Sequence, residues 1–196
     1  MSGIAAVILA GGRGERLGGA NKALIEIGGK RLIERALEAV AECTPVILSI
    51  GDADFGWPAL VPVPDLPTDY GGPLAGVAAA VDHLQAAPPA LLLTLAVDTP
   101  FFPHDFVTRA LPLLATAPAA ISAYGGQIYP TNGLWRFDRL ATLPGEVRNG
   151  TAPRSLKRLA ERLSATRLDY AGVSATDPFS NANTLQDLEI LQRRAR

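Results

Sequence analysis

The feature that most constrains the fold is an apolar run, residues 4–9, that leads directly into a glycine-rich segment, residues 10–17. Six consecutive apolar residues suit a strand that is covered on both faces. In the segment that follows, Gly12 and Gly14 permit left-handed backbone conformations and let main-chain N–H groups approach an anion closely. The sequence therefore predicts a buried strand that ends in a phosphate-binding loop.

The charge of this loop separates it from better-known glycine motifs. Arg13, Arg16 and the later Lys22 can neutralise phosphate charge that main-chain amides alone could not. The P-loop string G-x-x-x-x-G-K-[ST] does not occur, and Leu17 occupies the third glycine position of G-x-G-x-x-G. These differences favour a nucleoside triphosphate loop of another kind, the alternative being an ordinary turn with surface arginines.

Short apolar runs alternate with helical patterns along the rest of the chain, which predicts an α/β fold. The alternation favours three layers, in which helices cover both faces of a mostly parallel sheet, and a length of 196 residues predicts a single domain over residues 1–196. The predicted strands are residues 4–9, 46–50, 60–63, 91–97 and 119–124, and the predicted helices are residues 31–42, 73–84, 104–114, 154–163 and 184–191.

Composition excludes several classes of protein. A net charge of −1 argues against broad nucleic-acid or membrane-surface binding, so any affinity for phosphate must come from a local cluster. The longest apolar stretch, residues 90–97, is too short to span a bilayer, and the N-terminal apolar run lacks the basic region of a signal peptide. Cys43 is the only cysteine, which suits a cytoplasmic protein.

Two aspartates follow predicted strands at the edge where ligands collect in parallel sheets. Asp98 comes directly after residues 91–97, where a carboxylate is costly unless a cation meets it, and Mg²⁺ is a natural candidate. Asp65 follows residues 60–63 and could accept hydrogen bonds from a base or a ribose. The alternatives are that Asp98 caps the following turn and that Asp65 makes an Asx cap.

Two polar loops precede predicted helices. Residues 68–76 are rich in glycine and run into a helix whose positive N-terminal end, at Pro73, could face an anion. In the second loop, Asn183 could simply cap the last helix, where Thr184 and Asp187 resemble a capping box. Asn181 is less easily explained in that way, and its carboxamide could complete a metal–water shell or bind phosphate.

In their order, these motifs resemble the molybdenum cofactor guanylyltransferases, a family within the nucleotidyltransferases that open with L-A-G-G. Residues 9–22 are similar to the family's opening, L-A-G-G-x-x-x-R-M-G-G-x-D-K. Residues 65–76 match its second loop, residues 98–100 match its metal-binding D-T-P, and residues 179–188 resemble its late N-x-N-T-P-E-E-L segment. The resemblance runs through nearly the whole length of the chain.

The resemblance implies a Rossmann-like nucleotidyltransferase fold and a reaction in which the phosphate of molybdopterin, or of its molybdenum-bound form, attacks the α-phosphorus of GTP and pyrophosphate leaves. It implies Mg²⁺ held by Asp98 and catalytic roles for Arg16, Lys22 and Asp98. It also implies handover to molybdoenzymes, their chaperones or other cofactor-biosynthesis proteins. The residues expected to bind the substrates are Leu9, Ala10, Gly11, Gly12, Arg13, Gly14, Lys22, Ser49, Asp65, Gly76, Asp98, Arg154 and Asn181, the last two toward the pterin or the metal.

The chain departs from the family pattern at four positions. Asn21 stands where an Asp usually precedes the lysine, Ser49 where Asn is common, Leu185 where Pro follows Asn-Thr, and Tyr129 where His is more usual. Three alternatives therefore stay open: a sugar-phosphate or related nucleotidyltransferase, transfer of CMP to molybdopterin, and a non-catalytic nucleotide-binding homologue.

Overall fold

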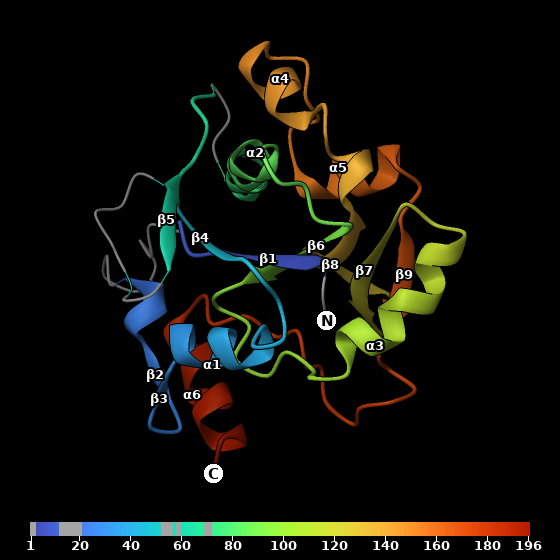
Figure 1. The fold of residues 1–196 in the computed structure, drawn as a ribbon. Helices are drawn as coiled ribbons and strands as arrows, with labels where there is room; N and C mark the ends of the chain where they lie inside the picture. Colours follow the sequence, from blue (N-terminus) through green and yellow to red (C-terminus); the bar gives the residue numbers. More distant parts are fainter. Residues whose placement is uncertain (1–2, 12–20, 52–56, 58–59, 69–71) are drawn as a thin grey trace.

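A central sheet crosses the molecule, with helices on both of its faces (Figure 1). The computed structural model describes residues 3–11, 21–51, 57, 60–68 and 72–196. Within these ranges the sheet has seven strands in the order β5-β4-β1-β6-β8-β7-β9. They are β1 (Ile4–Leu9), β4 (Val46–Gly51), β5 (Val61–Pro64), β6 (Leu91–Ala96), β7 (Ala119–Tyr124), β8 (Gln127–Arg136) and β9 (Thr166–Asp169), while β2 (Glu26–Ile27) and β3 (Lys30–Arg31) form a separate pair.

The sheet is mostly parallel, as predicted. Strands β5, β4, β1 and β6 run parallel, β7 and β9 run parallel to each other, and β8 is antiparallel to both of its neighbours. The helices are α1 (Leu32–Ala39), α2 (Pro73–Leu84), α3 (Phe106–Ala110), α4 (Leu143–Arg148), α5 (Leu156–Arg162) and, after the last strand, α6 (Leu185–Arg194), with 3₁₀ turns η2 (Lys22–Leu24), η3 (Leu111–Ala115) and η4 (Phe137–Arg139).

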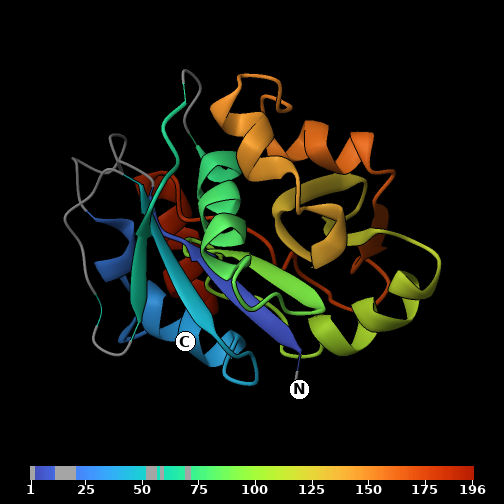
Figure 2. The same ribbon diagram turned by 45° about the horizontal axis from the view of Figure 1, so that its top comes forward.

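The buried strand β1 divides the core into two layers. Its side chains alternate between the two faces: Ile4 and Ile8 pack in the layer that contains α1, α3 and α6, and Val7 packs in the layer that contains α2, α4 and α5. Figures 1 and 2 show these two groups of helices on opposite sides of the sheet. Among the described residues, no helix combines the length and the apolar character that crossing a membrane requires.

The predicted strands and helices are found with shifted ends, and several elements were missed, among them the short pair β2 and β3. Strand β8 escaped prediction because Pro130, Asn132 and Gly133 break its apolar pattern, and the short β9 and α4 were not predicted either. The helix expected over residues 104–114 continues beyond α3 only as the 3₁₀ turn η3, because Pro112 lacks the N–H that an α-helix needs. The capping box of Thr184 and Asp187 is confirmed.

Cys43 is expected to resist alkylation in the folded chain. Its side chain is buried in the layer beneath α1, and this burial raises the pKa of the thiol to about 11. Only the thiolate reacts, so iodoacetamide at pH 8 should modify the native chain about a hundredfold more slowly than the urea-unfolded chain. Mass spectrometry of the adduct measures both rates, and equal rates in the two states would contradict a buried thiol.

Candidate active site

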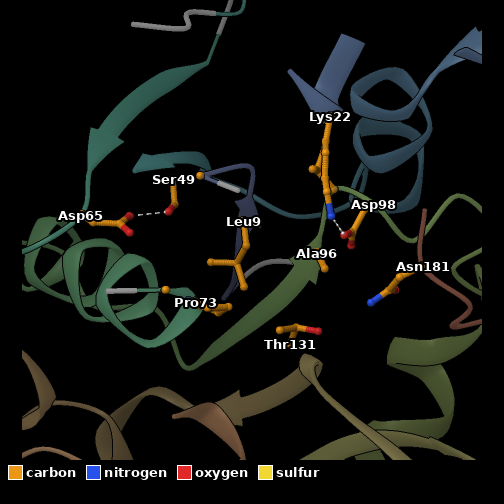
Figure 3. Close-up of a pocket in the computed structure, with 12 residues that line it drawn as sticks. Leu9, Lys22, Ser49, Asp65, Pro73, Ala96, Asp98, Thr131 and Asn181 are labelled. Carbon is orange, nitrogen blue, oxygen red and sulfur yellow. Dashed lines mark hydrogen bonds and ion pairs between the residues drawn. The ribbon is translucent and has the colours of Figure 1, made fainter. Parts of the chain in front are cut away.

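A cavity of about 290 Å³ lies at the carboxyl ends of β1, β4 and β6, the edge at which ligands collect in parallel sheets (Figure 3). Two polar groups of side chains face each other across it, with apolar residues of β1 and β6 between them. The cavity is lined by Leu9, Gly11, Lys22, Ser49, Asp65, Gly72, Pro73, Ala96, Val97, Asp98, Thr131 and Asn181.

The first polar group is an ion pair between Lys22 and Asp98. The Lys22 ammonium lies 2.8 Å from Asp98 Oδ2 and donates a second hydrogen bond, of 2.6 Å, to Asn183 Oδ1. The side chains of Lys22 and Asp98 are 15% and 14% exposed. Because both charges are largely shielded from water, each interacts more strongly with its partner, and with any bound ligand, than a surface charge would.

The turn that carries Lys22 is held by Asn21. The side-chain oxygen of Asn21 accepts a hydrogen bond from the Ala23 N–H at 3.0 Å and caps η2. Asn21, which stands where the resembled family has Asp, therefore shapes the turn, while the orientation of Lys22 comes from Asp98 and Asn183.

The loop that carries Asp98 is tied to the segment before α6. The carbonyl oxygen of Asp98 accepts a hydrogen bond from the Ala182 N–H at 3.0 Å. Next along the chain, the Thr99 hydroxyl donates to Asn181 Oδ1 at 3.0 Å. These two bonds bring the late polar loop to the end of β6, although more than 80 residues separate them in the sequence.

The second polar group is Ser49 with Asp65. The buried Ser49 hydroxyl, at the end of β4, donates to Asp65 Oδ1 at 2.9 Å. Helix α2 passes directly over this pair, because a Cβ placed on Gly76 would lie 2.2 Å from Ser49 Oγ. Gly11 permits a similar close approach between the ends of β1 and β4, since its Cβ would lie 2.8 Å from the Gly51 nitrogen. The Ser49–Asp65 pair therefore depends on Gly76, and the close approach of the ends of β1 and β4 depends on Gly11.

The structure brings most of the described predicted site residues together. Ala10 is buried beside the cavity and donates its N–H to the Ser49 carbonyl. Arg154 is exposed just before α5 and does not line the cavity. The predicted site residues that line the cavity are Leu9, Gly11, Lys22, Ser49, Asp65, Asp98 and Asn181. Four others, Gly12, Arg13, Gly14 and Arg16, lie outside the described residues.

Several polar residues of the site were missed or left undecided by sequence reasoning. Thr184 makes the helix cap, so Asn183 is available as the partner of Lys22. Thr131 lines the cavity and Asn132 lies fully buried beside it. The signal for these two was a polar pair between Pro130 and Gly133, in a strand that was itself not predicted.

The donor set suits a divalent cation that is shared with a substrate. Among the described residues there is no group of three or more His, Cys, Asp or Glu that could hold a metal ion alone. Asp98 nevertheless offers a shielded carboxylate at the cavity wall. A hard cation that keeps several waters and takes further oxygens from substrate phosphates needs only one or two protein carboxylates. The residues present therefore fit such an ion.

Comparison with known proteins decides the family. Residues 6–170 match the model of the MobA-like NTP transferase domain. The chain belongs to this family. It is therefore a nucleotidyltransferase, and the use of a divalent metal ion is general for such enzymes.

Relatives and solved structures extend the comparison over the whole chain. The chain is 37% identical to the molybdenum cofactor guanylyltransferase of Rhodobacter capsulatus, over 98% of this chain and 97% of the relative. It is 34% identical to that of Bradyrhizobium sp. (strain ORS 278), over 96% and 92%. The molybdopterin-guanine dinucleotide biosynthesis protein A of Archaeoglobus fulgidus has the same fold, with a TM-score of 0.73, 22% identity and 97% of each chain covered.

Proposed function

We propose that this MobA-like transferase moves GMP from GTP to the phosphate of molybdopterin, or of its molybdenum-bound form, and releases pyrophosphate. The product is the guanine dinucleotide form of the molybdenum cofactor. The names of the relatives support the substrates. The observation that carries the proposal is that the Lys22–Asp98 pair and the Ser49–Asp65 pair face one cavity from opposite sides, which suits a ligand with a charged end and a polar end.

The triphosphate end is assigned to Lys22 and Asp98. Transfer of a nucleotidyl group requires in-line positioning and neutralisation of the charge that grows on pyrophosphate, and it requires no nucleophile from the protein. Asp98 would hold Mg²⁺, which when bound supplies positive charge to the phosphate oxygens. Lys22 would donate to a phosphate oxygen in place of one of its present partners. The charges of Arg13 and Arg16 would also serve to neutralise the phosphates.

The base end is assigned to Asp65. A carboxylate only accepts hydrogen bonds, and guanine presents two neighbouring N–H donors on one edge, from N1 and the 2-amino group. Cytosine presents one amino donor beside an acceptor nitrogen, which a carboxylate would repel. The Ser49 hydroxyl, by donating to Asp65 Oδ1, orients this carboxylate. The pair therefore favours guanine, and Ser49 takes over an orienting part at a position where the resembled family often has Asn.

Nucleotide preference in the presence of molybdopterin is the test of this proposal. The purified chain is supplied with Mg²⁺, molybdopterin and one of GTP, CTP or ATP, and released pyrophosphate and the dinucleotide product are measured. We expect turnover with GTP and at least about tenfold less with the others, as one or two hydrogen bonds provide. Preference for CTP would overturn the base assignment. Binding of GTP without pyrophosphate release would indicate a non-catalytic homologue.

Two further points belong to the same proposal. Delivery of the product to molybdoenzymes, their chaperones or other cofactor-biosynthesis proteins follows from the substrates proposed. Cys43 is the only cysteine, so the chain can form no disulfide within itself. Such a chain suits a reducing compartment, which supports the cytoplasm as its site of action.

A further inference from the structure

The pairing of strand β8 with β7 is interrupted at the point where β8 reaches the cavity. It pairs with β7 as far as Gly133, opposite Ile121, and pairing resumes at Tyr129, opposite Ser122. Residues 130–132 therefore have no partner on β7 and form a bulge. Bulges of this kind redirect side chains and are frequent next to active sites. Here the bulge carries one residue that lines the cavity, Thr131, and one that is fully buried, Asn132.

The start of the bulge is anchored to the loop that leads to Asn181. The Tyr129 hydroxyl donates a hydrogen bond to the Asp177 carboxylate. Burial, followed by this hydrogen bond, raises the pKa of Tyr129 above its ordinary value, so the phenol keeps the proton that it donates. The bulge and the loop before α6 are thus joined directly at one end, and at the other end they are linked through Thr99, which bonds to both Asn132 and Asn181.

The amide of Asn132 can adopt only one orientation. The last pair between β6 and β8 is Thr94 with Gly133. Beyond it, Asn132 Oδ1 accepts a hydrogen bond from the Ala96 N–H at 2.9 Å. Because a main-chain N–H is always a donor, the oxygen of the amide must face it and the amide nitrogen must face the other way. The nitrogen then donates to Thr99 Oγ1 at 3.2 Å.

This orientation sets the direction of the next hydrogen bond. Thr99 is buried, and its oxygen already accepts from Asn132, so its proton is directed to Asn181 Oδ1, 3.0 Å away. The oxygen of Asn181 is thereby turned toward Thr99. Figure 3 shows the consequence: the amide nitrogen of Asn181 points into the cavity, beside Asp98.

We propose that Asn132 is a positioning residue which, through Thr99, makes Asn181 present its amide N–H groups to a phosphate oxygen of the bound substrate. This inference rests on the proposed function and deepens it. Asn181 then acts as a phosphate donor and is not a ligand of the divalent metal, because its oxygen is held by Thr99. The alternative is that this relay, the hydrogen bonds from Asn132 to Thr99 and from Thr99 to Asn181, only stabilises the bulge.

Binding of inorganic pyrophosphate in the absence of metal tests whether Asn181 is a phosphate donor or a metal ligand. Calorimetry in EDTA measures pyrophosphate affinity, and titration of pyrophosphate release with Mn²⁺ gives the concentration for half-maximal activity. Loss of a hydrogen bond to a charged group costs about tenfold to a hundredfold in affinity. We expect Asn181→Ala to weaken pyrophosphate binding by this factor and to leave the Mn²⁺ requirement unchanged. A raised Mn²⁺ requirement with unchanged pyrophosphate binding would instead make Asn181 a metal ligand and overturn the proposal.

The relay itself is tested by a pair of matched threonine variants. Thr99→Val removes the hydroxyl that joins Asn132 to Asn181. Thr94→Val is its control, because Thr94 is also buried and lies at the same junction of β6 and β8, but its hydroxyl accepts from Trp135 Nε1 and donates to the Gly133 carbonyl instead of joining Asn132 to Asn181. We expect both to lower Tm and only Thr99→Val to weaken pyrophosphate binding, by about tenfold. Equal affinities in the two variants would reduce the relay to a stabilising contact.

A double-mutant cycle shows whether Asn132 acts through Asn181. Asn132→Leu alone should weaken pyrophosphate binding about tenfold, and in the Asn181→Ala background it should have no further effect, because the group it positions is gone. Additive losses would mean that Asn132 acts by another route. Pyrophosphate is a product of every nucleotidyl transfer, so these measurements keep their meaning if the wild-type chain proves to prefer a substrate other than GTP or molybdopterin.

Discussion

Asp98→Asn is expected to slow nucleotidyl transfer by about a hundredfold to a thousandfold, the range seen when one group that stabilises transition-state charge is removed. The asparagine keeps the shape of the side chain and can still accept a hydrogen bond from Lys22, 2.8 Å away in the native chain. It removes the negative charge that a divalent cation requires and leaves the Lys22 ammonium, only 15% exposed, without its counter-charge. The initial rate of pyrophosphate release at saturating GTP and Mg²⁺ measures the effect.

The control is Asp82→Asn, which removes an ion pair with Arg148 between α2 and α4. Because this pair is more exposed, its loss should change stability little and should leave turnover unchanged. In Asp98→Asn, the Mg²⁺ concentration for half-maximal rate should also rise. If Asp98→Asn and Asp82→Asn turned over at the same rate, Asp98 would have to be removed from the reacting centre.

The sequence predicted both members of this ion pair but not that they meet. Lys22 and Asp98 were each recognised from the local pattern, a basic residue after a glycine loop and an acid after a buried strand. Their contact depends on β6 lying next to β1 in the sheet, and 76 residues separate the two in the chain. Strand order is decided by how all the helices and strands pack together, so it could not be derived from either segment alone.

Strand β8 was not predicted, because residues that form the site interrupt its apolar pattern. Strand β8 carries a proline, polar residues and a glycine where a strand of this sheet would ordinarily be apolar. Those residues form the bulge that brings Thr131 to the cavity and buries Asn132. Functional sites are expected to break local rules in this way. The polar pair between Pro130 and Gly133 was the signal available in the sequence.

The late polar loop shows a different kind of limit. Thr184 and Asp187 were recognised as a capping box because a cap is local, and the structure confirms it. The partner of Asn183 is Lys22, 161 residues away, and no local pattern could identify it. Asn181 was recognised as unusual, but its contact with Thr99, which determines where its amide points, again depends on the tertiary fold.

The second large effect is expected at Gly76, in the first turns of α2. A methyl group there would lie 2.2 Å from Ser49 Oγ, far inside normal contact, and 3.1 Å from Asp65 Oδ1, which is a tight contact. The Ser49 hydroxyl is buried and cannot move away without breaking its 2.9 Å hydrogen bond to Asp65. We expect Gly76→Ala to raise KM for GTP by about tenfold to a hundredfold, because displacement and the lost hydrogen bond act on the same carboxylate. Steady-state pyrophosphate release measures KM.

Gly145→Ala provides the matched control, because Gly145 also lies within a helix, α4, and its added methyl group would have nothing within 4 Å. Alanine stabilises a helix relative to glycine by up to about 1 kcal/mol, so helix propensity favours alanine at both positions. Only Gly76→Ala, which adds the clash, should lose affinity for GTP. Ser49→Ala removes the hydrogen bond without the clash and should raise KM less, by about threefold to tenfold. If KM rises most in Gly76→Ala, less in Ser49→Ala and not at all in Gly145→Ala, the carboxylate that binds the base is Asp65, directly beneath α2. If Gly76→Ala behaved like Gly145→Ala, GTP would have to bind without using the Ser49–Asp65 pair.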